Sequence, residues 1–411
     1  MSVESDSPYS EKPLSPEEAR INALHRVLEA EVKDPTGSDS IIAAMCEAFI
    51  YELQESPLKE VVNDACRYRQ ERRGRDIQPR NLMNLMIRAV QKQMLKHYPN
   101  YPNSSLYEIS VYWQHIILRN MYFDEAIMEE LFTDIALRDV QTNLPDRYKS
   151  HKLIALSEVD RLGEQPTMID IGTSDLQGPN KLRLDGTFSD IKVVEATCGS
   201  VLPALESTQQ AKVTTNRRAT ALVNDVLRRS FSIGPSLGID RVRRDLGNDE
   251  WVFACSFRPK DLRNQEHREE YQALMSKVVP GVDFTVAEIT EQGIKPPIDR
   301  KAKIVTNVTT SYLLSPKERQ VLREVSRELV EDDGLIIHQD FMWLPEGSDE
   351  FVYYEKWVPW TYQTFVEDPR TNKVLPVFQW ETGRTRSVRL LAGLSKFAIG
   401  ESVKPLLRKS L

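Results

Sequence analysis

The sequence predicts a two-domain protein, with an all-helical domain over residues 15–155 and an α/β domain over residues 156–411. A chain of 411 residues exceeds what one ordinary hydrophobic core accommodates, which favours two domains. Before about residue 150, apolar residues recur at helical spacing, whereas after about residue 161 short β-rich runs alternate with helical segments. Such alternation is typical of a mainly parallel sheet with helices on its faces.

The composition is that of a globular protein in a reducing compartment. Hydrophobic residues make up 40% and charged residues 28% of the chain, and no stretch approaches the ~18 apolar residues of a membrane span. Residues 1–14 are polar, do not resemble a secretory signal and are expected to form a disordered tail. We expect a cytoplasmic protein without bound metal, because the cysteines are widely separated, at Cys46, Cys66, Cys198 and Cys255. The net charge of −7 argues against nucleic acid as a partner.

Helix signals in the first domain are local. The sequence Ser15-Pro16-Glu17-Glu18 is a capping box with proline at the first helical position. Two further helices are predicted from apolar residues at helical spacing, namely Ile41, Ile42, Met45, Ala48, Phe49 and Leu53, and then Leu82, Leu85, Met86, Val90 and Leu95. Another helix is expected over residues 105–119.

Short β-rich runs define the second domain. The runs expected to alternate with helices are TMIDIG, IKVVEAT, LGIDRV, WVFACSF, VDFTVAEIT, AKIVTNVTT and GLIIHQDF. After them, FVYYEKWVPWTYQTF and VLPVFQWETG are separated by the turn sequence DPRTNK. This last pair predicts two antiparallel strands at the edge of the parallel sheet.

The clearest supersecondary signal is a strand–helix–strand crossover over residues 303–341. A strand containing Ile304, Val305 and Val308 leads to Ser315-Pro316-Lys317-Glu318, a capping box. The helix that follows is predicted to bury Val321, Leu322, Val325 and Leu329. We expect an acidic turn at residues 331–334, and then the apolar strand Leu335-Ile336-Ile337.

This crossover resembles the fourth strand, helix and fifth strand of class I S-adenosylmethionine-dependent methyltransferases. VDFTVAEIT, LGIDRV and TMIDIGTSDLQG are similar to the third, second and first strands of that family, and the antiparallel pair to its sixth and seventh. The resemblance covers roughly residues 160–385 and implies a Rossmann-like seven-stranded methyltransferase sheet with an antiparallel terminal pair, interrupted by an insert at about residues 179–235. It leaves the helical domain unassigned.

The resemblance also implies a site for S-adenosylmethionine. Its residues would be Asp170, Gly172, Thr173, Ser174, Asp240, Glu288, Ile289 and Asn307. Within it, Asp240 or Glu195 would bind the ribose hydroxyls, and Glu288 would lie near the adenine amino group. The family's loop has three glycines, but this chain has Ser174 and Leu176 at the last two positions. A nicotinamide fingerprint would match at only one of its three glycines, so a dehydrogenase is disfavoured.

Polar residues after the fourth and fifth strands are the candidates for catalysis. Asn307, Thr309 and Tyr312 follow the fourth strand, where the family lines its substrate cleft, and Tyr312 is a candidate catalytic residue. His338 and Asp340 end the fifth strand, at the edge where open α/β sheets bind ligands. His338 is suited to accept a proton, and the alternative is a hydrogen-bonded structural histidine.

The expected function is methyl transfer from S-adenosylmethionine to an oxygen or nitrogen of a small-molecule or carrier-bound acceptor. The helical domain and the insert would cover the substrate, and the helical domain also offers a surface for a homodimer. One alternative is a non-catalytic scaffold, suggested by the two missing loop glycines. The other is an RNA methyltransferase, supported by an arginine run and opposed by the acidic net charge: Arg67, Arg69, Arg72, Arg73, Arg75 and Arg80.

Overall fold

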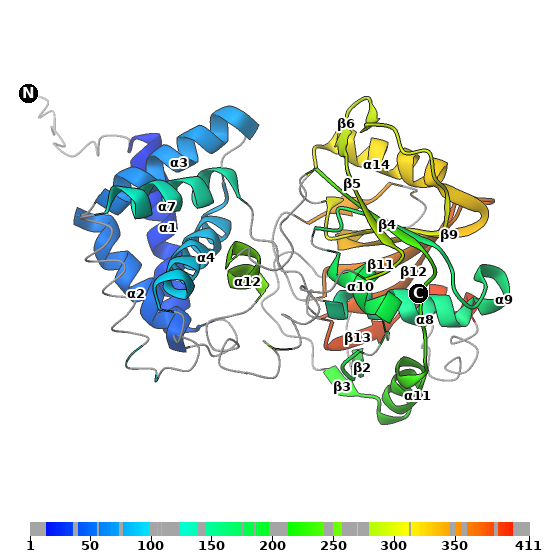
Figure 1. Cartoon of the computed structure of the whole chain (residues 1–411). Helices are drawn as coiled ribbons and strands as arrows, with labels where there is room; N and C mark the ends of the chain where they lie inside the picture. The colour runs from blue at the N-terminus through cyan, green and yellow to red at the C-terminus, as the bar shows by residue number, and fades with distance from the viewer. Residues whose placement is uncertain are drawn as a thin grey trace, which may run out of the picture. The chain divides into compact units, whose positions relative to one another are not determined.

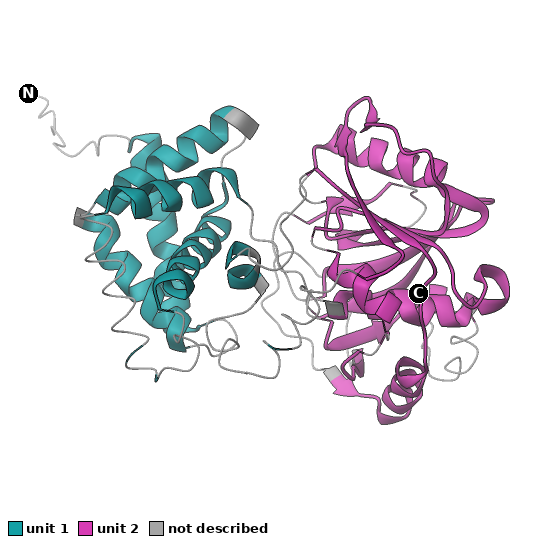
Figure 2. Cartoon of the chain, viewed as in Figure 1, with its two compact units in different colours: residues 1–142, 248–271 teal, residues 143–247, 272–411 magenta. Residues whose placement is uncertain are grey.

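The chain divides into two compact units, which are described separately (Figures 1 and 2). Unit 1 comprises residues 1–142 and 248–271, and unit 2 comprises residues 143–247 and 272–411. The second unit thus begins before the predicted boundary at residue 155. A computed structural model describes residues 14–35, 40–55, 57–73, 77–98, 105, 108, 124–138, 145–174, 176–184, 186, 188–196, 213–241, 250–256, 269, 279–311, 314–345, 348, 350–354, 360–381 and 385–397. The predicted tail and almost all of the predicted helix over residues 105–119 lie outside these ranges.

Unit 1 is helical throughout its described part. Its helices are α1 (Pro16–Lys33), α2 (Ser40–Glu55), α3 (Pro57–Arg73), α4 (Pro79–His97), α7 (Glu125–Leu137) and α12 (Glu250–Ser256). The predicted capping box of α1 is confirmed, because Ser15 Oγ accepts from the Glu18 amide and the Glu18 carboxylate accepts from the Ser15 amide. The apolar residues predicted for the second and fourth helices form its core, with Met45, Phe49 and Leu82 fully buried. No described helix has the length and apolar character needed to cross a bilayer.

The run WVFACSF was predicted as a strand, and this prediction is wrong. It forms helix α12, which packs against α4 within unit 1. Trp251, Ala254 and Cys255 are buried at the three- and four-residue spacing of one helical face. A short apolar run fits a strand and a buried helix equally well, and tertiary packing decides between them. Cys46 and Cys66 are likewise free and buried, while Cys198 lies outside the described residues.

Arginines of the basic run at residues 67–80 form hydrogen bonds and ion pairs within unit 1. Arg69 is buried and donates to the carbonyls of Ile135 at 3.1 Å and Arg138 at 2.7 Å. Arg67 pairs with Glu17 at 2.7 Å, and Arg80 with Glu31 at 3.5 Å. Arg75 and the side chains of Arg72 and Arg73 lie outside the described residues. The described members therefore hold helices together and lend little support to an RNA-binding surface.

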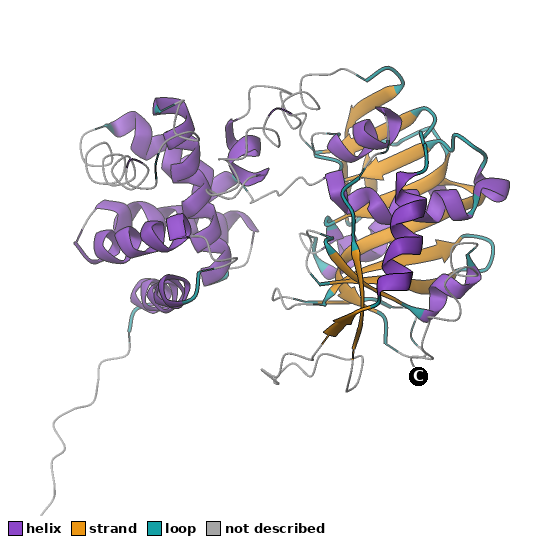
Figure 3. Cartoon of the chain, turned by 90° about the horizontal axis from the view of Figure 1, so that it is seen from below, coloured by secondary structure: helices purple, strands orange, loops and turns teal. Residues whose placement is uncertain are grey.

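Unit 2 is built on one mixed sheet that is largely parallel at its centre (Figure 3). The described residues place eleven strands in it, in the order β3-β2-β13-β12-β11-β9-β8-β1-β4-β5, with β10 paired to β9. The strands are β1 (Met168–Ile171), β2 (Lys192–Ala196), β3 (Val213–Thr215), β4 (Ser236–Asp240), β5 (Val282–Val286), β8 (Ala302–Val308), β9 (Val330–Trp343), β10 (Val352–Tyr353), β11 (Tyr362–Asp368), β12 (Lys373–Trp380) and β13 (Ser387–Leu390). A small separate sheet pairs β6 (Glu288–Thr290) with β7 (Gly293–Lys295).

A seven-stranded sheet is therefore not confirmed. The predicted antiparallel pair is present as β11 and β12, but β13 continues the sheet beyond it. The insert then adds β2 parallel to β13, and β3 antiparallel to β2. Strands of the insert, far from the end of the chain in sequence, thus extend the same edge of the sheet. Such long-range pairing leaves no local signal in the sequence.

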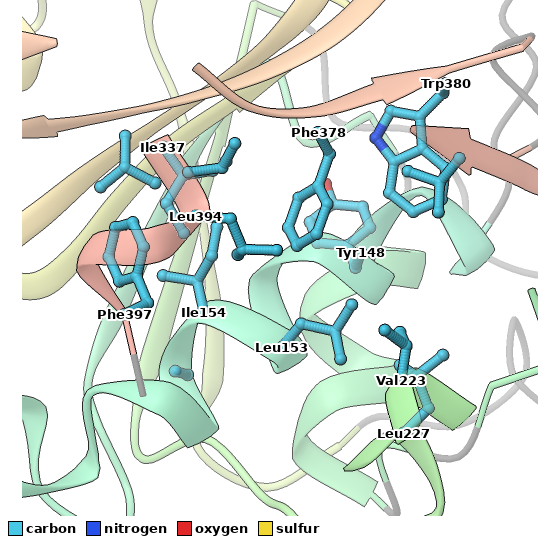
Figure 4. Packing of buried hydrophobic residues seen from close by; sticks show 14 of the residues in the cluster. Tyr148, Leu153, Ile154, Val223, Leu227, Ile337, Phe378, Trp380, Leu394 and Phe397 are labelled. Carbon is cyan, nitrogen blue, oxygen red and sulfur yellow. The ribbon is translucent and has the colours of Figure 1, made fainter. Parts of the chain in front are cut away.

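Helices cover both faces of the sheet and define two separate cores. The short helices η3 (Pro145–Tyr148), α8 (Lys149–Ser157) and α9 (Val159–Leu162) precede β1, and α10 (Gln177–Leu184) and α11 (Arg217–Arg228) follow it. One face, here the α8 face, buries Leu153, Ile154, Val223, Ile337 and Trp380 together (Figure 4). On the opposite α14 face, helix α14 (Pro316–Leu329) buries its apolar side chains against β1, β8 and β9. The 3-10 helix η6 (Ala392–Lys396) follows β13.

The predicted crossover is confirmed in its strand, its capped helix and its second strand. Ser315 and Glu318 form the capping box of α14, and the four apolar residues predicted to be buried are buried. Residues 331–334, expected to form an acidic turn, are included in β9, which begins at Val330. The pairing with β8 jumps from Ala302–Val330 to Ile304–Leu335, so these four residues form a bulge before the regular pairing that begins at Leu335. Gly334 allows this, since a Cβ there would lie 2.6 Å from the carbonyl oxygen of Lys303 on β8.

We predict that Gly334→Ala destabilises unit 2 by about 1–3 kcal/mol, because a Cβ at this position overlaps backbone that cannot easily move. The matched control is Asp332→Ala, an exposed position on the same strand, which should change stability by less than about 0.5 kcal/mol. Urea unfolding of both variants checks this expectation. Equal stabilities of the two variants would show that β8 and β9 are not so closely apposed.

Candidate functional site

The loop after β1 has an unusual backbone. Gly172, Ser174 and Leu176 have φ values of +79°, +57° and +63°, all in the left-handed region. This region is disfavoured by roughly 1–2 kcal/mol for residues other than glycine. Ser174 and Leu176 occupy the two positions at which the methyltransferase loop that this sequence resembles has glycine. The loop thus has a backbone suited to glycine at three alternating positions, although only one of them is glycine.

Contacts with β4 hold the loop in this conformation. The Ser174 amide donates to Asp240 Oδ2 at 2.8 Å, and the Gly172 amide donates to the carbonyl of Ile239 at 2.7 Å. The Leu176 side chain lies over Gly238, where a Cβ would be 2.2 Å from Leu176 Cδ2. A hydrogen-bonded backbone and a buried side chain together outweigh the unfavourable dihedral angles.

Gly172 itself is required by packing against β8. A Cβ there would lie 2.1 Å from Thr310 Oγ1, which donates to the carbonyl of Ile171 at 3.2 Å. The loop therefore rests between the ends of β4 and β8, the strands on either side of β1. Both lie parallel to β1, so their carboxyl ends meet at this edge of the sheet.

Asp170 is a fully buried carboxyl group at the start of the loop. Its Oδ2 accepts a hydrogen bond of 2.6 Å from the Tyr148 hydroxyl. The Thr173 hydroxyl also lies within reach of this carboxyl group, and among the described residues neither Asp170 Oδ1 nor Thr173 Oγ1 has another hydrogen-bond partner. Burial raises the pKa of Asp170 to about 6, helped by the nearby charge of Asp240 and opposed by the hydrogen bonds from Tyr148 and Thr173. A buried carboxyl group with acceptor capacity left over is suited to bind a cation or a hydrogen-bond donor.

Tyr148 belongs to a buried polar segment that sequence reasoning missed. Residues 147–152 are all buried, and Gly178 of α10 lies so close to the Tyr148 ring that a Cβ would be 2.0 Å from it. Lys149 Nζ contacts Asp146 at 3.0 Å and Ser189 at 2.8 Å, and His151 Nε2 lies 2.6 Å from Thr306 Oγ1. Burial lowers the pKa of His151 to about 3, which keeps the ring neutral. Runs of charged residues usually lie in solvent, so the sequence DRYKSHK (residues 146–152) does not predict burial. The high density of polar residues in this stretch ahead of the first strand is the one sequence feature that marks the segment.

Gln339 joins this segment to the sheet. Its Nε2 donates to the carbonyl of Arg147 at 2.8 Å and to the Tyr362 hydroxyl at 3.0 Å, while its Oε1 accepts from Ser150 and Thr364. The Tyr362 hydroxyl is in turn 2.9 Å from Thr309 Oγ1. Thr309 has a φ of +57°, an uncommon value for a β-branched residue, and it accepts from Arg147 Nη1 at 3.1 Å.

The predicted catalytic histidine lies on the opposite face. His338 Nδ1 is 3.0 Å from Asn307 Nδ2, and its Nε2 is 3.2 Å from Glu367 Oε2. Glu367 also accepts from Arg323 at 3.0 Å and Arg327 at 2.5 Å. Burial alone would raise the pKa of Glu367, but the bond from His338 and the neighbouring positive charges hold it at about 2. With both ring nitrogens engaged, His338 fits the hydrogen-bonded structural histidine better than a proton acceptor.

The remaining predicted residues are dispersed. Asp340 is buried on the same face as His338, and its Oδ1 accepts from the Phe341 amide at 2.7 Å. Glu288 is exposed on the β6–β7 hairpin, whereas Ile289 is buried in the core beneath α14 and therefore does not fit the predicted cofactor contact. Tyr312 lies outside the described residues.

The two candidates for the ribose acid are also separated. Asp240 ends β4 beside the loop. Glu195 lies on β2 near the far edge of the sheet and accepts from Asn216 Nδ2 at 2.7 Å. The structure therefore brings Asp170, Gly172, Thr173, Ser174 and Asp240 together at one edge of the sheet, while Asn307, His338 and Asp340 point to the α14 face.

Comparison with models of known protein families and with curated protein sequences finds no match. The site must therefore be interpreted from its own chemistry. Two carboxylates in different environments, the buried Asp170 and the partly exposed Asp240, flank a loop that has left-handed backbone at three positions. This arrangement can bind a ligand that carries both a positive charge and hydroxyl groups.

We predict that Gly172→Ala costs roughly 2–4 kcal/mol of unfolding free energy, because it combines an unfavourable φ with overlap of Thr310. Gly172→Ala in a Thr310→Gly background is the matched control, since it keeps the unfavourable φ but removes the side chain that the new Cβ would overlap. Relative to Thr310→Gly alone, it should lose only about 1 kcal/mol. Urea unfolding separates the two contributions, and equal losses would contradict the described packing of Thr310 on the loop.

Proposed function

We propose that unit 2 binds S-adenosylmethionine at the loop after β1 and transfers its methyl group to an oxygen or nitrogen of a small-molecule or carrier-bound acceptor. The observation that carries this proposal is the left-handed backbone at Gly172, Ser174 and Leu176. Strained backbone that surrounding contacts enforce is concentrated at ligand-binding sites. Here it lies beside a buried carboxyl group that, among the described residues, is approached only by the hydroxyls of Tyr148 and Thr173 and so keeps acceptor capacity.

The order of the parallel strands supports a Rossmann-like site. Numbered along the chain, the five strands β5, β4, β1, β8 and β9 have the spatial order 3-2-1-4-5. This is the order of doubly wound sheets, whose ligands bind outside the carboxyl ends of the strands, where the strand order reverses. In this unit that point lies between β1 and β8, beside the 172–176 loop.

The residues at the loop fit the parts of S-adenosylmethionine. The ionised Asp170 carboxylate would pair with the ammonium group, and the Thr173 hydroxyl, which lies beside that carboxylate, would contact the same part of the cofactor. Asp240 keeps acceptor capacity for ribose hydroxyls, because each of its oxygens accepts one backbone amide, from Ser174 and Arg241. When bound, the cofactor supplies a methyl group already activated by a sulfonium.

The chain's own contribution would be mainly orientation and exclusion of water. The buried segment 147–152 and the hydroxyls of Thr309 and Tyr362 line the adjoining end of β8 on the α8 face and would exclude water from that side of the site. Asp340 and Tyr312 remain the candidates for a proton acceptor, since His338 is engaged by Asn307 and Glu367.

One observation favours a non-catalytic scaffold as the second candidate. The side chains of Ser174 and Leu176 are buried, and Leu176 fills the space above Gly238. A loop packed in this way could persist for structural reasons alone. Failure to bind the cofactor would support this alternative.

We predict that S-adenosylhomocysteine at 100 times its dissociation constant stabilises the full chain by about 2.7 kcal/mol, which raises the unfolding temperature by roughly 2–4 °C. Asp170→Asn should abolish this shift because a neutral amide cannot pair with the ammonium group. The variant should fold well, since the pKa of Asp170 is raised to about 6 and ionisation above that pH opposes folding. The shift in the native chain should therefore shrink as the pH falls below about 6.

Two results would contradict the proposal. The first is no shift with S-adenosylhomocysteine at pH 7.5, confirmed by calorimetric titration, which would indicate the scaffold. The second is an equal shift with NAD⁺, which would point to a dinucleotide site. Unfolding temperatures with both ligands, for the native chain and Asp170→Asn, distinguish these cases.

A further inference from the structure

A row of polar side chains crosses the sheet at the same edge as the loop. Asp340 on β9 pairs in register with Gln363 on β11, Gln363 with Gln379 on β12, and Gln379 with Arg389 on β13. Residues directly opposite each other on antiparallel strands project from the same face. The four side chains therefore form one continuous row, which spans about 14 Å at the usual spacing between strands.

Among the described residues, one hydrogen-bonding edge of Arg389 has no partner. Its Nη1 is 3.4 Å from Gln379 Oε1, a long contact, and its guanidinium carbon lies 4.1 Å from the centre of the Trp360 ring. Within the described part of the chain, its Nε is buried and has no hydrogen-bond partner. Since Gln379 approaches Nη1, the edge formed by Nε and Nη2 remains for another acceptor.

The stacking partner Trp360 is held rigidly. Its φ is +71°, which is rare for a bulky residue. Its amide donates to the carbonyl of Glu381 at 3.0 Å, and its carbonyl accepts from Gln379 Nε2 at 2.7 Å. Gln379 thus contacts both Trp360 and Arg389, so the guanidinium plane is fixed before any ligand binds. Pre-organisation of this kind lowers the entropy lost on binding.

Asp340, Gln363 and Gln379 are buried, whereas Arg389 at the end of the row is half-buried. We propose that the Nε–Nη2 edge of Arg389 binds the carboxylate of a ligand that approaches the Asp340–Arg389 row at its Arg389 end. Resting on the proposed function, this ligand is assigned to the methyl acceptor, because the row begins at Asp340 and lies at the edge that carries the cofactor loop. The acceptor would then be an elongated molecule with a carboxylate at the end distant from the methylated atom.

The chemistry of the site favours a carboxylate over a phosphate. The planar fork of a guanidinium matches a carboxylate in two parallel hydrogen bonds. Burial lowers the pKa of Arg389, and the charge of Glu381 counteracts that effect. The same negative charge opposes a dianion, so a singly charged group fits better than a phosphate dianion.

The test uses benzoate as the carboxylate probe, benzamide as its neutral counterpart and inorganic phosphate as the competing anion, each titrated into the full chain by ligand-observed NMR. Native protein should bind benzoate and discriminate against benzamide. Arg389→Gln should weaken benzoate binding by about tenfold to a hundredfold, and Arg389→Lys, which keeps the charge without the fork, should weaken it less. Arg386→Gln, at an exposed arginine three residues earlier, should leave benzoate binding unchanged.

Equal binding of benzoate and benzamide by the native chain would overturn the proposal, and this comparison needs no variant. Undiminished benzoate binding by Arg389→Gln, or stronger binding of phosphate than of benzoate at this arginine, would overturn it as well. The unfolding shift with S-adenosylhomocysteine is measured on the same samples. Benzoate binding at Arg389 without that shift would uphold the carboxylate site and refute its assignment to a methyl acceptor.

Discussion

The hydrogen bond from the Ser174 amide to Asp240 is the contact on which the arrangement of the site depends. It ties the loop after β1 to the end of β4 while Ser174 and Leu176 hold left-handed backbone conformations. Glycine would adopt these conformations without strain. Here the fold keeps the geometry by other means, with a carboxylate fixing one position and a buried leucine above Gly238 fixing the other. The backbone of the loop thus has the form that a glycine-rich sequence favours, although only Gly172 of the three positions is glycine.

Hydrogen bonds also stabilise the buried polar and charged side chains beside the loop. Tyr148 bonds to Asp170, and the residues around it supply hydrogen-bond partners for the ends of β8 and β9. A buried polar network is stable only when its members are satisfied, and most of these groups are. Asp170 Oδ1 and Thr173 Oγ1, three residues apart in sequence, have no partner beyond each other within the described residues, and they lie at the point where the strand order reverses. Asp170 and Thr173 are therefore the part of the network where a ligand could supply the remaining hydrogen bonds.

Much of the architecture was predictable because its signals are local. The capping boxes at Ser15 and Ser315, the strand that contains Asp170 and the antiparallel pair follow from a few adjacent residues each. The helix at Trp251 was missed because a short apolar run does not distinguish a strand from a buried helix. The number of strands was missed because β2 pairs with β13, nearly 200 residues away in sequence, and β3 then pairs with β2.

The site was predictable only in part, for a related reason. The loop and Asp240 were identified from sequence, but alternation along β9 sends His338 and Gln339 to opposite faces. From the sequence we therefore chose His338, which pairs with Glu367, and did not identify Gln339, which contacts the buried segment 147–152. Arg389 belongs to no recognisable sequence motif. Its proposed role follows only from the register of the four antiparallel strands β9, β11, β12 and β13.

The most direct test of the central claim is amide hydrogen exchange across residues 170–178, measured with and without S-adenosylhomocysteine. If the strained loop holds the cofactor, its amides should exchange more slowly when the ligand is present, while those of α11 should not change. Unchanged exchange in the loop at saturating ligand, or protection centred on another part of the chain, would contradict the claim.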